Sequence, residues 1–298
     1  MTSKNIDCNI PPFLPKTKQK TKNNTDLPSL SKNIHRLLSM VTNSKTDNRQ
    51  LAKIIKQSPA ISTRLIFLAN SAWTSPKKPV NNVEQACTIL GHSIVKSVSF
   101  GISISSSFDP GKCRSFKIDH FWTTSMLVSE GAGLLASKLS DRINHVDFEQ
   151  TAQSAGLLHN IGLLWLADNL PKETNKALQH YSAEPLSTIN EALLEYTGTD
   201  YCEVGAWLGD QLGFPEVLII AIKHHLNNQY QESCWETALI VESAAAMVAA
   251  LRHQCKEVPE NTRLVALGLD LPTQQTIFQQ LSENFEKTQE LAESLFTT

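Results

Sequence analysis

The spacing of apolar residues is the feature that most restricts the fold of this chain. From residue 26 onward they recur every three or four positions, as on one buried face of a helix, first at Ile34, Leu37, Leu38 and Val41. The same period returns over residues 119–139, 147–167, 185–197, 200–212, 215–227 and 236–253. No segment alternates apolar and polar residues as a half-buried strand does. The sequence therefore predicts an all-α fold.

Turn-forming residues divide the predicted helices into larger units. A helical subdomain is expected over residues 26–107, because Phe108-Asp109-Pro110-Gly111 supplies a turn after it. A second helical subdomain is expected over residues 108–230, with a helical extension over 231–298. Residues 1–25 combine prolines and lysines with few apolar side chains, which is typical of a disordered tail.

Charge and cysteine content weigh against several classes of function. A net charge of −2 gives no global reason for binding nucleic acid or a membrane surface. The longest nearly apolar segment, residues 238–251, contains Glu242 and falls short of the roughly 20 residues of a spanning helix. The six cysteines form no C-x-x-C pair, and the N-terminus lacks the apolar core of a signal peptide. We therefore expect a cytoplasmic protein with no nucleic-acid partner.

One glycine pattern matches a nucleotide-binding motif. Gly131-Ala132-Gly133-Leu134-Leu135-Ala136 fits G-x-G-x-x-A, which binds a pyrophosphate when it follows a strand and opens a helix. The preceding residues, 121–130, show a helical period instead. The pattern therefore favours close packing between helices over a dinucleotide site.

Two histidine segments carry the most site-like side chains. His159 stands beside Asn160, and His224-His225 ends an apolar helix. Adjacent helical residues point about 100° apart, so we expect only one of His224 and His225 to face a pocket. A hydrolytic metal site would need a carboxylate beside these imidazoles, and Asn160 is neutral. The residues alone therefore favour hydrogen bonding within the bundle over metal binding.

Several short motifs follow one another in a specific order. They are Leu27-Pro28-x-Leu30, Ile54-x-x-x-Ser58-Pro59-Ala60, Arg64-Leu65-x-x-Leu68-Ala69-Asn70-Ser71-Ala72, Val83-Glu84-Gln85-Ala86, Ile89-Leu90-Gly91, Phe121-Trp122-x-x-Ser125, Ala155-Gly156-Leu157-Leu158-His159-Asn160-Ile161-Gly162 and Gly213-Phe214-Pro215. In this order, up to His224-His225, they resemble the HDOD domain, a catalytically silent relative of the HD and HD-GYP phosphohydrolases of bacterial signalling proteins. The resemblance implies a multi-helix bundle in two helical subdomains.

The resemblance also implies where an active relative holds its metal ligands. Four of these positions carry other residues here, namely Thr124, Asn160, Tyr201 and Ala245. Only His159 and one of His224 and His225 remain from the ligand set. We therefore expect a vestigial site with no metal, no cofactor and no enzymatic activity. His120 and Glu203 are the residues nearest to restoring such a site.

A regulatory role follows from the same resemblance. It implies a protein that acts on a signalling protein partner through binding, with a homodimer as an open alternative. We expect the partner in the groove between the two subdomains, with Asn70, Trp73, Lys77 and Lys78 as candidate contacts. Two other functions stay open: a receptor that binds a nucleotide or cyclic dinucleotide in the vestigial pocket, and a residual metal-dependent phosphohydrolase.

Overall fold

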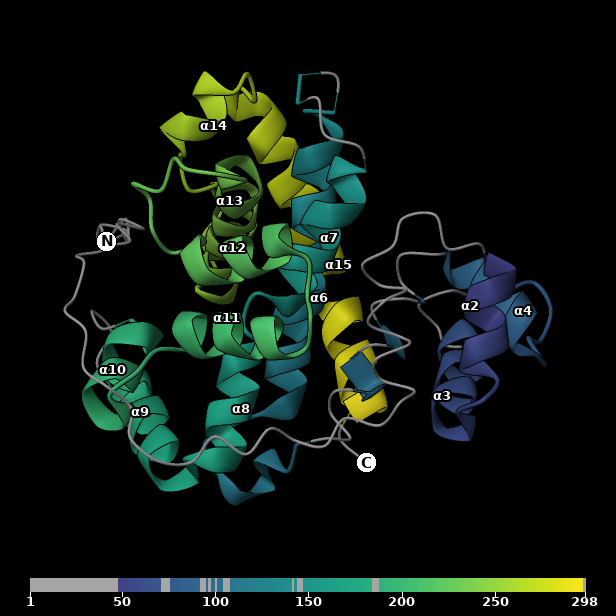
Figure 1. Cartoon of the computed structure of the whole chain (residues 1–298). Helices are drawn as coiled ribbons and strands as arrows, with labels where there is room; N and C mark the ends of the chain where they lie inside the picture. Colours follow the sequence, from purple (N-terminus) through teal and green to yellow (C-terminus); the bar gives the residue numbers. More distant parts are fainter. Residues whose placement is uncertain are drawn as a thin grey trace, which may run out of the picture.

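The structure, a computed structural model, describes residues 48–70, 76–91, 95, 98–99, 101–103, 108–140, 142–143, 147–183 and 188–296. The predictions for the tail over residues 1–25, the helix near residues 34–41 and Trp73 lie outside these residues. The described chain forms a smaller and a larger group of helices (Figure 1). It contains helices and no strand, so the prediction of an all-α fold is confirmed.

The smaller group lies at the right of Figure 1 and comprises α2 (Asn48–Ile55), α3 (Pro59–Ala69) and α4 (Val83–Leu90). Pro59 occupies the first turn of α3, where its missing N–H removes no helical hydrogen bond. The side chain of Asn82 caps α4 by accepting a hydrogen bond from the Gln85 amide, and Gly91 ends α4 at a φ of 78°. The apolar faces of these helices share one core, which includes Ile55, Leu65, Leu68, Ala86 and Leu90.

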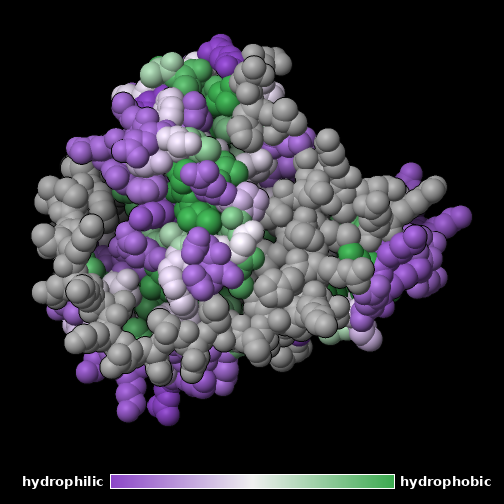
Figure 2. Space-filling model, viewed as in Figure 1, coloured by the Kyte–Doolittle hydropathy of each residue, from purple (hydrophilic) through white to green (hydrophobic). Residues whose placement is uncertain are grey.

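The larger group follows the short 3₁₀ helix η1 (Pro110–Lys112). Its helices are α6 (Ile118–Ser137), α7 (Phe148–Leu158), α8 (Ile161–Asn169), α9 (Pro171–Ala183), α10 (Ile189–Thr197), α11 (Tyr201–Gln211), α12 (Glu216–His224), α13 (Trp235–Arg252), α14 (Thr262–Ala266) and α15 (Leu271–Phe296). The helix at the centre is α6, which packs against α7, α13 and α15. Hydrophilic residues cover much of the coloured surface in the same view, and apolar residues show between them (Figure 2).

Two helix predictions differ from the structure. The single helix predicted over residues 147–167 is broken between α7 and α8, because Asn160 adopts a φ of −108° and a ψ of 13°. The helix α9 was not predicted, because its only buried residues are Thr174 and Ala177 and it therefore carries no apolar stripe. Pro171 stands at the first position of α9, which proline tolerates.

The glycine pattern of α6 serves helix packing, as the sequence predicts. A Cβ on Gly131 would lie 3.0 Å from the Leu281 side chain of α15 and 3.2 Å from that of Ala244 of α13. On α7, a Cβ on Gly156 would lie 2.7 Å from the carbonyl oxygen of Val128 in α6. These glycines therefore let three helices approach the backbone of α6 closely.

The C-terminal helix joins the two groups. It runs along α6, and its residues Leu291 and Leu295 are buried in the core of the smaller group. At its last residue, the Phe296 ring stacks on Trp122 of α6 with centroids 4.8 Å apart. The end of α15 therefore packs at the junction of the two groups, where the sequence analysis places a partner.

We expect Leu295→Ala to lower the free energy of unfolding by roughly 2–5 kcal/mol, because it leaves a cavity at a fully buried position. Urea unfolding followed by circular dichroism measures this change. Glu290→Ala is the matched control, since Glu290 is exposed on the same helix and should change stability by at most about 0.5 kcal/mol. Equal stability of the two variants would contradict the packing of Leu295 in the core of the smaller group.

Candidate functional site

His225 lies at the end of α12 and is fully buried. Its Nδ1 atom lies 2.9 Å from the carbonyl oxygen of Ile222 and 3.2 Å from that of Ala221. A carbonyl oxygen only accepts hydrogen bonds, so Nδ1 carries the proton of the neutral ring. The Nε2 atom is therefore left as an acceptor, and it is this nitrogen that is free to bind a metal or a hydrogen-bond donor.

Tyr201 supplies such a donor. Its hydroxyl oxygen lies 3.3 Å from Nε2 of His225, and the Sγ atom of Cys202 lies 4.0 Å from the same nitrogen. The first turn of α11 places both side chains, because the Asp200 carboxylate caps that helix by accepting from the amides of Cys202 and Glu203. The neutral phenol therefore donates a hydrogen bond to Nε2 of His225.

The position of Tyr201 depends on a close contact between α8 and α11. A Cβ on Gly162 would lie 2.1 Å from the carbonyl oxygen of Tyr201 and 2.5 Å from the amide nitrogen of Gly205. No side chain fits at Gly162 unless the helices separate. Glycine at this position therefore holds the start of α11 against the start of α8.

His159 and Asn160 form the link between α7 and α8, and both are buried. The Nδ1–H of His159 donates to the carbonyl oxygen of Gly156 at 2.6 Å. Its ring meets His225 edge-on, with centroids 5.3 Å apart and planes at 88°. The Oδ1 atom of Asn160 accepts a hydrogen bond from the Ser125 hydroxyl of α6 at 2.9 Å.

These side chains form one buried polar group, which we call the imidazole cluster: Ser125, His159, Asn160, Tyr201, Cys202 and His225. Burial lowers the pKa of His159 to about 3, with a further contribution from His225. Burial lowers the pKa of His225 to about 4, and it raises the pKa values of the Tyr201 phenol and the Cys202 thiol well above their ordinary ranges. At neutral pH the cluster therefore carries no net charge.

Other predicted site residues lie apart from this cluster. Thr124 is half-buried on α6, and its hydroxyl donates to the carbonyl oxygen of His120 at 2.8 Å. His224 is half-buried and stacks on Tyr230, with ring centroids 4.0 Å apart. Ala245 lies half-buried on α13 and offers no donor atom. Of the predicted set, the structure therefore brings together His159, Asn160, Tyr201 and His225.

Three further residues of this region, Ser125, Cys202 and Asn190, were not predicted as site residues. Asn190 of α10 donates from Nδ2 to Sγ of Cys202 at 3.4 Å, which extends the buried polar contacts to α10. Ser125 was named only as part of a motif and Cys202 only as one of the scattered cysteines. The contacts that give them roles join residues 35 and 23 positions apart, so no local pattern marks them.

The donors of the imidazole cluster do not fit the metal pair of an active HD relative. The Nε2 atom of His225 is covered by the Tyr201 hydroxyl, and Asn160 offers a neutral amide oxygen that already accepts from Ser125. A hard divalent cation needs carboxylate charge to offset its desolvation. Among the described residues, no three His, Cys, Asp or Glu side chains converge as a metal site would require.

The family comparison agrees with the motif order. The model of the HDOD domain matches residues 27–228 of the chain. The chain belongs to the HDOD domain family. The matched region contains every predicted position of the vestigial site except Ala245, and α13, α14 and α15 follow it. In this HDOD chain, the segment beyond the match completes the core of the smaller helix group through Leu291 and Leu295.

Solved structures share the fold of the HDOD chain. A candidate signal transduction protein from Marinobacter aquaeolei has 20% identity and a TM-score of 0.78; the alignment covers 91% of this chain but only 60% of that protein. An HDOD domain protein of unknown function from Geobacter sulfurreducens has 19% identity and a TM-score of 0.70, with 92% and 94% covered. A candidate phosphohydrolase from Shewanella amazonensis has 21% identity and a TM-score of 0.68, with 90% and 95% covered. Among curated proteins, none matches the chain.

The sequence predicts that the apolar segment over residues 238–251 is too short to span a membrane, and the described helices bear on this prediction. None of them combines the length and the apolar character that crossing a bilayer requires. This agrees with the interruption of the apolar segment of α13 by Glu242.

The imidazole cluster predicts that acid destabilises the fold. An unfolded imidazole has a pKa near 6.5, whereas His159 and His225 have pKa values of about 3 and about 4 in the folded chain. Between those values the unfolded chain binds more protons, so stability is complete above about pH 6.5 and falls towards pH 4 by up to roughly 1.4 kcal/mol per pH unit for each imidazole. Urea unfolding at several pH values should show a smaller slope for His225→Gln. The exposed control His253→Gln should keep the wild-type slope.

The phenol of Tyr201 predicts a second measurable effect. Tyr201→Phe leaves Nε2 of His225 without its oxygen donor, so we expect a loss of about 1–3 kcal/mol in the free energy of unfolding. Tyr196→Phe is the matched control, because Tyr196 is half-buried and its hydroxyl makes no hydrogen bond within the described chain. If the two variants unfold at the same urea concentration, the Tyr201 hydrogen bond contributes nothing.

Proposed function

We propose that this HDOD chain is a non-enzymatic regulatory protein of bacterial signal transduction, which acts in the cytoplasm by binding another protein. The observation that carries the proposal is the hydrogen bond from Tyr201 to Nε2 of His225. At the position where the resemblance implies a metal ligand, this chain has a phenol that hydrogen-bonds to His225, one of the two imidazoles that remain. The signalling role named for the Marinobacter protein of the same fold supports the regulatory part of the proposal.

Burial of the imidazole cluster argues against both alternatives, the residual phosphohydrolase and the nucleotide receptor. His159 is 3% exposed and His225 is fully buried, so a nucleotide would have to displace core side chains before touching either ring. The pKa of each imidazole is also far below neutrality, because burial disfavours the charged form. Neither ring is therefore available as a general acid near pH 7.

Hydrolysis and metal content test the non-enzymatic part. Protein purified without chelator should contain clearly less than one metal ion per chain by mass spectrometry. It should hydrolyse bis(p-nitrophenyl) phosphate no faster than buffer does, with or without added Mn²⁺. Stoichiometric metal together with turnover that His159→Ala abolishes would establish the phosphohydrolase instead.

A nucleotide panel tests the receptor alternative. Melting curves of the purified protein should not shift with mononucleotides or cyclic dinucleotides, because the imidazole cluster is closed by its own side chains. A concentration-dependent rise in melting temperature with one of these nucleotides, lost in Tyr201→Phe but kept in Tyr196→Phe, would favour a receptor. Both outcomes are independent of where a protein partner binds.

A further inference from the structure

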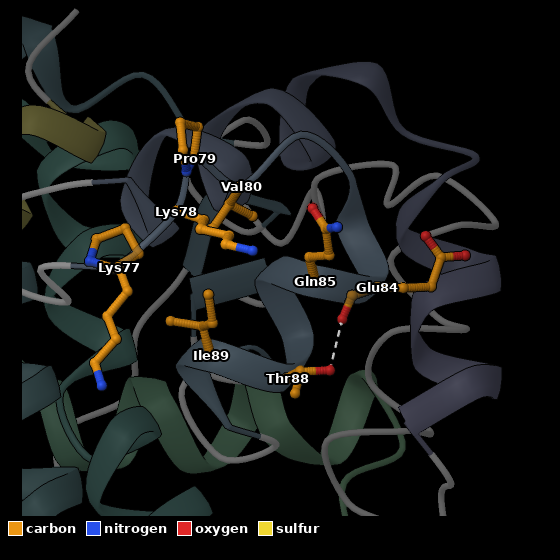
Figure 3. Close-up of a pocket in the computed structure, with 9 residues that line it drawn as sticks. Lys77, Lys78, Pro79, Val80, Glu84, Gln85, Thr88 and Ile89 are labelled. Carbon is orange, nitrogen blue, oxygen red and sulfur yellow. Dashed lines mark hydrogen bonds between the residues drawn. The ribbon is translucent and has the colours of Figure 1, made fainter.

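A groove lies in the smaller helix group, between the loop over residues 76–82 and the exposed face of α4 (Figure 3). It is a shallow, open groove of about 530 Å³ that offers room for a side chain of a bound peptide. The groove is separate from the imidazole cluster, and its lining residues belong to neither the cluster nor the replaced ligand positions.

The loop wall of the groove is held in place by a side-chain bracket. The amide of Asn70 donates from Nδ2 to the carbonyl oxygen of Val80 at 2.8 Å and accepts the Val80 N–H at Oδ1, also at 2.8 Å. The same Nδ2 donates to Ile66 within α3 at 2.9 Å. Asn70, predicted as a partner contact, thus ties the loop to the end of α3. A loop fixed in this way loses little entropy when a partner binds.

The floor and walls of the groove are mainly apolar. Val80 is 3% exposed and forms part of the floor, whereas Ile89 of α4 is 44% exposed. Figure 3 shows the Ile89 side chain pointing from α4 towards the loop that carries Val80 and Lys78. Ile89 and Pro79 both line the groove, so its apolar surface comes from the loop as well as from α4.

The charge of the groove is positive. Lys77 and Lys78 are exposed on its rim, and neither forms an ion pair within the described chain. The carboxylate of the groove, Glu84, is paired with Lys56 of α2 and points away from the loop in Figure 3. Two unpaired ammonium groups therefore face any segment that enters the groove.

We propose that this groove binds an acidic segment of a partner protein that inserts one aliphatic or aromatic side chain against Ile89 and Val80. The lysines lie on the rim, where charges increase the rate of association. The apolar residues lie at the centre, where a side chain of the partner can be buried. The inference deepens the proposed function and rests on it, because it names the chemistry of the protein that this chain binds.

Other occupants fit the groove less well. A nucleic acid would need many cations along its backbone, and the groove offers two beside an apolar floor. A second copy of the chain would have to present an acidic segment to the groove. The helix α15 has four exposed acids, but they surround Lys287 and not an exposed apolar side chain that could serve as the anchor: Glu283, Glu286, Glu290 and Glu293. Both occupants are separated from the proposed one by the experiment.

The probe is a displayed library of random 12-residue peptides, selected on the wild-type full-length chain. We expect the selected peptides to combine Asp or Glu with an aliphatic or aromatic residue. Synthetic copies should lose roughly ten-fold or more in affinity for the variant Lys77→Glu/Lys78→Glu by fluorescence anisotropy. Ile89→Asp should weaken them comparably, because it removes the apolar contact and adds a like charge.

The matched control is Lys53→Glu/Lys172→Glu, which changes the net charge equally at two exposed lysines outside the groove and should bind like wild type. Three results would overturn the groove proposal: peptides that bind the two double variants equally, a single-stranded oligonucleotide that displaces them at similar affinity, or a selection that yields none. Loss of a wild-type dimer in Lys77→Glu/Lys78→Glu by sedimentation would assign the groove to a second copy. Peptides that bind at another surface would contradict the groove but not the proposed function. The hydrolysis assay tests the non-enzymatic part of that function separately.

Discussion

The packing of α6 against α7, α13 and α15 is the constraint on which the rest of the structure depends. At these crossings a Cβ on Gly156 would overlap the backbone of α6, and a Cβ on Gly131 would lie only 3.0 Å from the Leu281 side chain of α15. From the same helix, Ser125 bonds to Asn160 in the imidazole cluster, and Trp122 stacks on Phe296 at the end of α15. One helix therefore positions both the imidazole cluster and the junction of the two helix groups. A shift of α6 would change the Ser125–Asn160 hydrogen bond and the Trp122–Phe296 stacking together.

The imidazole cluster shows how a core satisfies two buried histidines with hydrogen bonds. A buried polar group is costly unless it finds a hydrogen-bond partner. Both rings donate from Nδ1 to carbonyl oxygens near the ends of their own helices, and His225 also accepts from Tyr201. Tyr201 and Asn160 are therefore neutral hydrogen-bonding groups that fit a closed core. This explains why His159 and His225 remain compatible with tight packing.

The imidazole cluster and the groove beside α4 differ in burial and in charge. The cluster is buried and neutral, so its effect is on stability and on the positions of α7, α8, α11 and α12. The groove beside α4 is exposed, apolar at its floor and positive at its rim, and the Asn70 bracket holds its loop in place. In the proposed function the larger helix group is the scaffold, and the smaller one carries the groove for the partner.

The sequence determined the type of element and many of its ends. The apolar period predicts helices, because it records which face of each segment is buried. Asp200 caps α11, and Gly213 takes the positive φ that ends a helix, as local patterns indicate. The order of short motifs identified the family, and the same resemblance predicts the replaced ligand positions Thr124, Asn160 and Tyr201. These features depend on neighbouring residues, so they can be read without knowing the fold.

Only the tertiary structure decided which buried faces meet. The break at Asn160, the pairing of Tyr201 with His225 across 24 residues, and the sharing of α15 between two cores have no local signal. The polar helix α9 likewise forms without an apolar stripe of its own. The physical reason is that a hydrogen bond needs two atoms within about 3 Å, and that distance is set by how helices pack. A periodic sequence specifies that a face is buried but not which partner covers it.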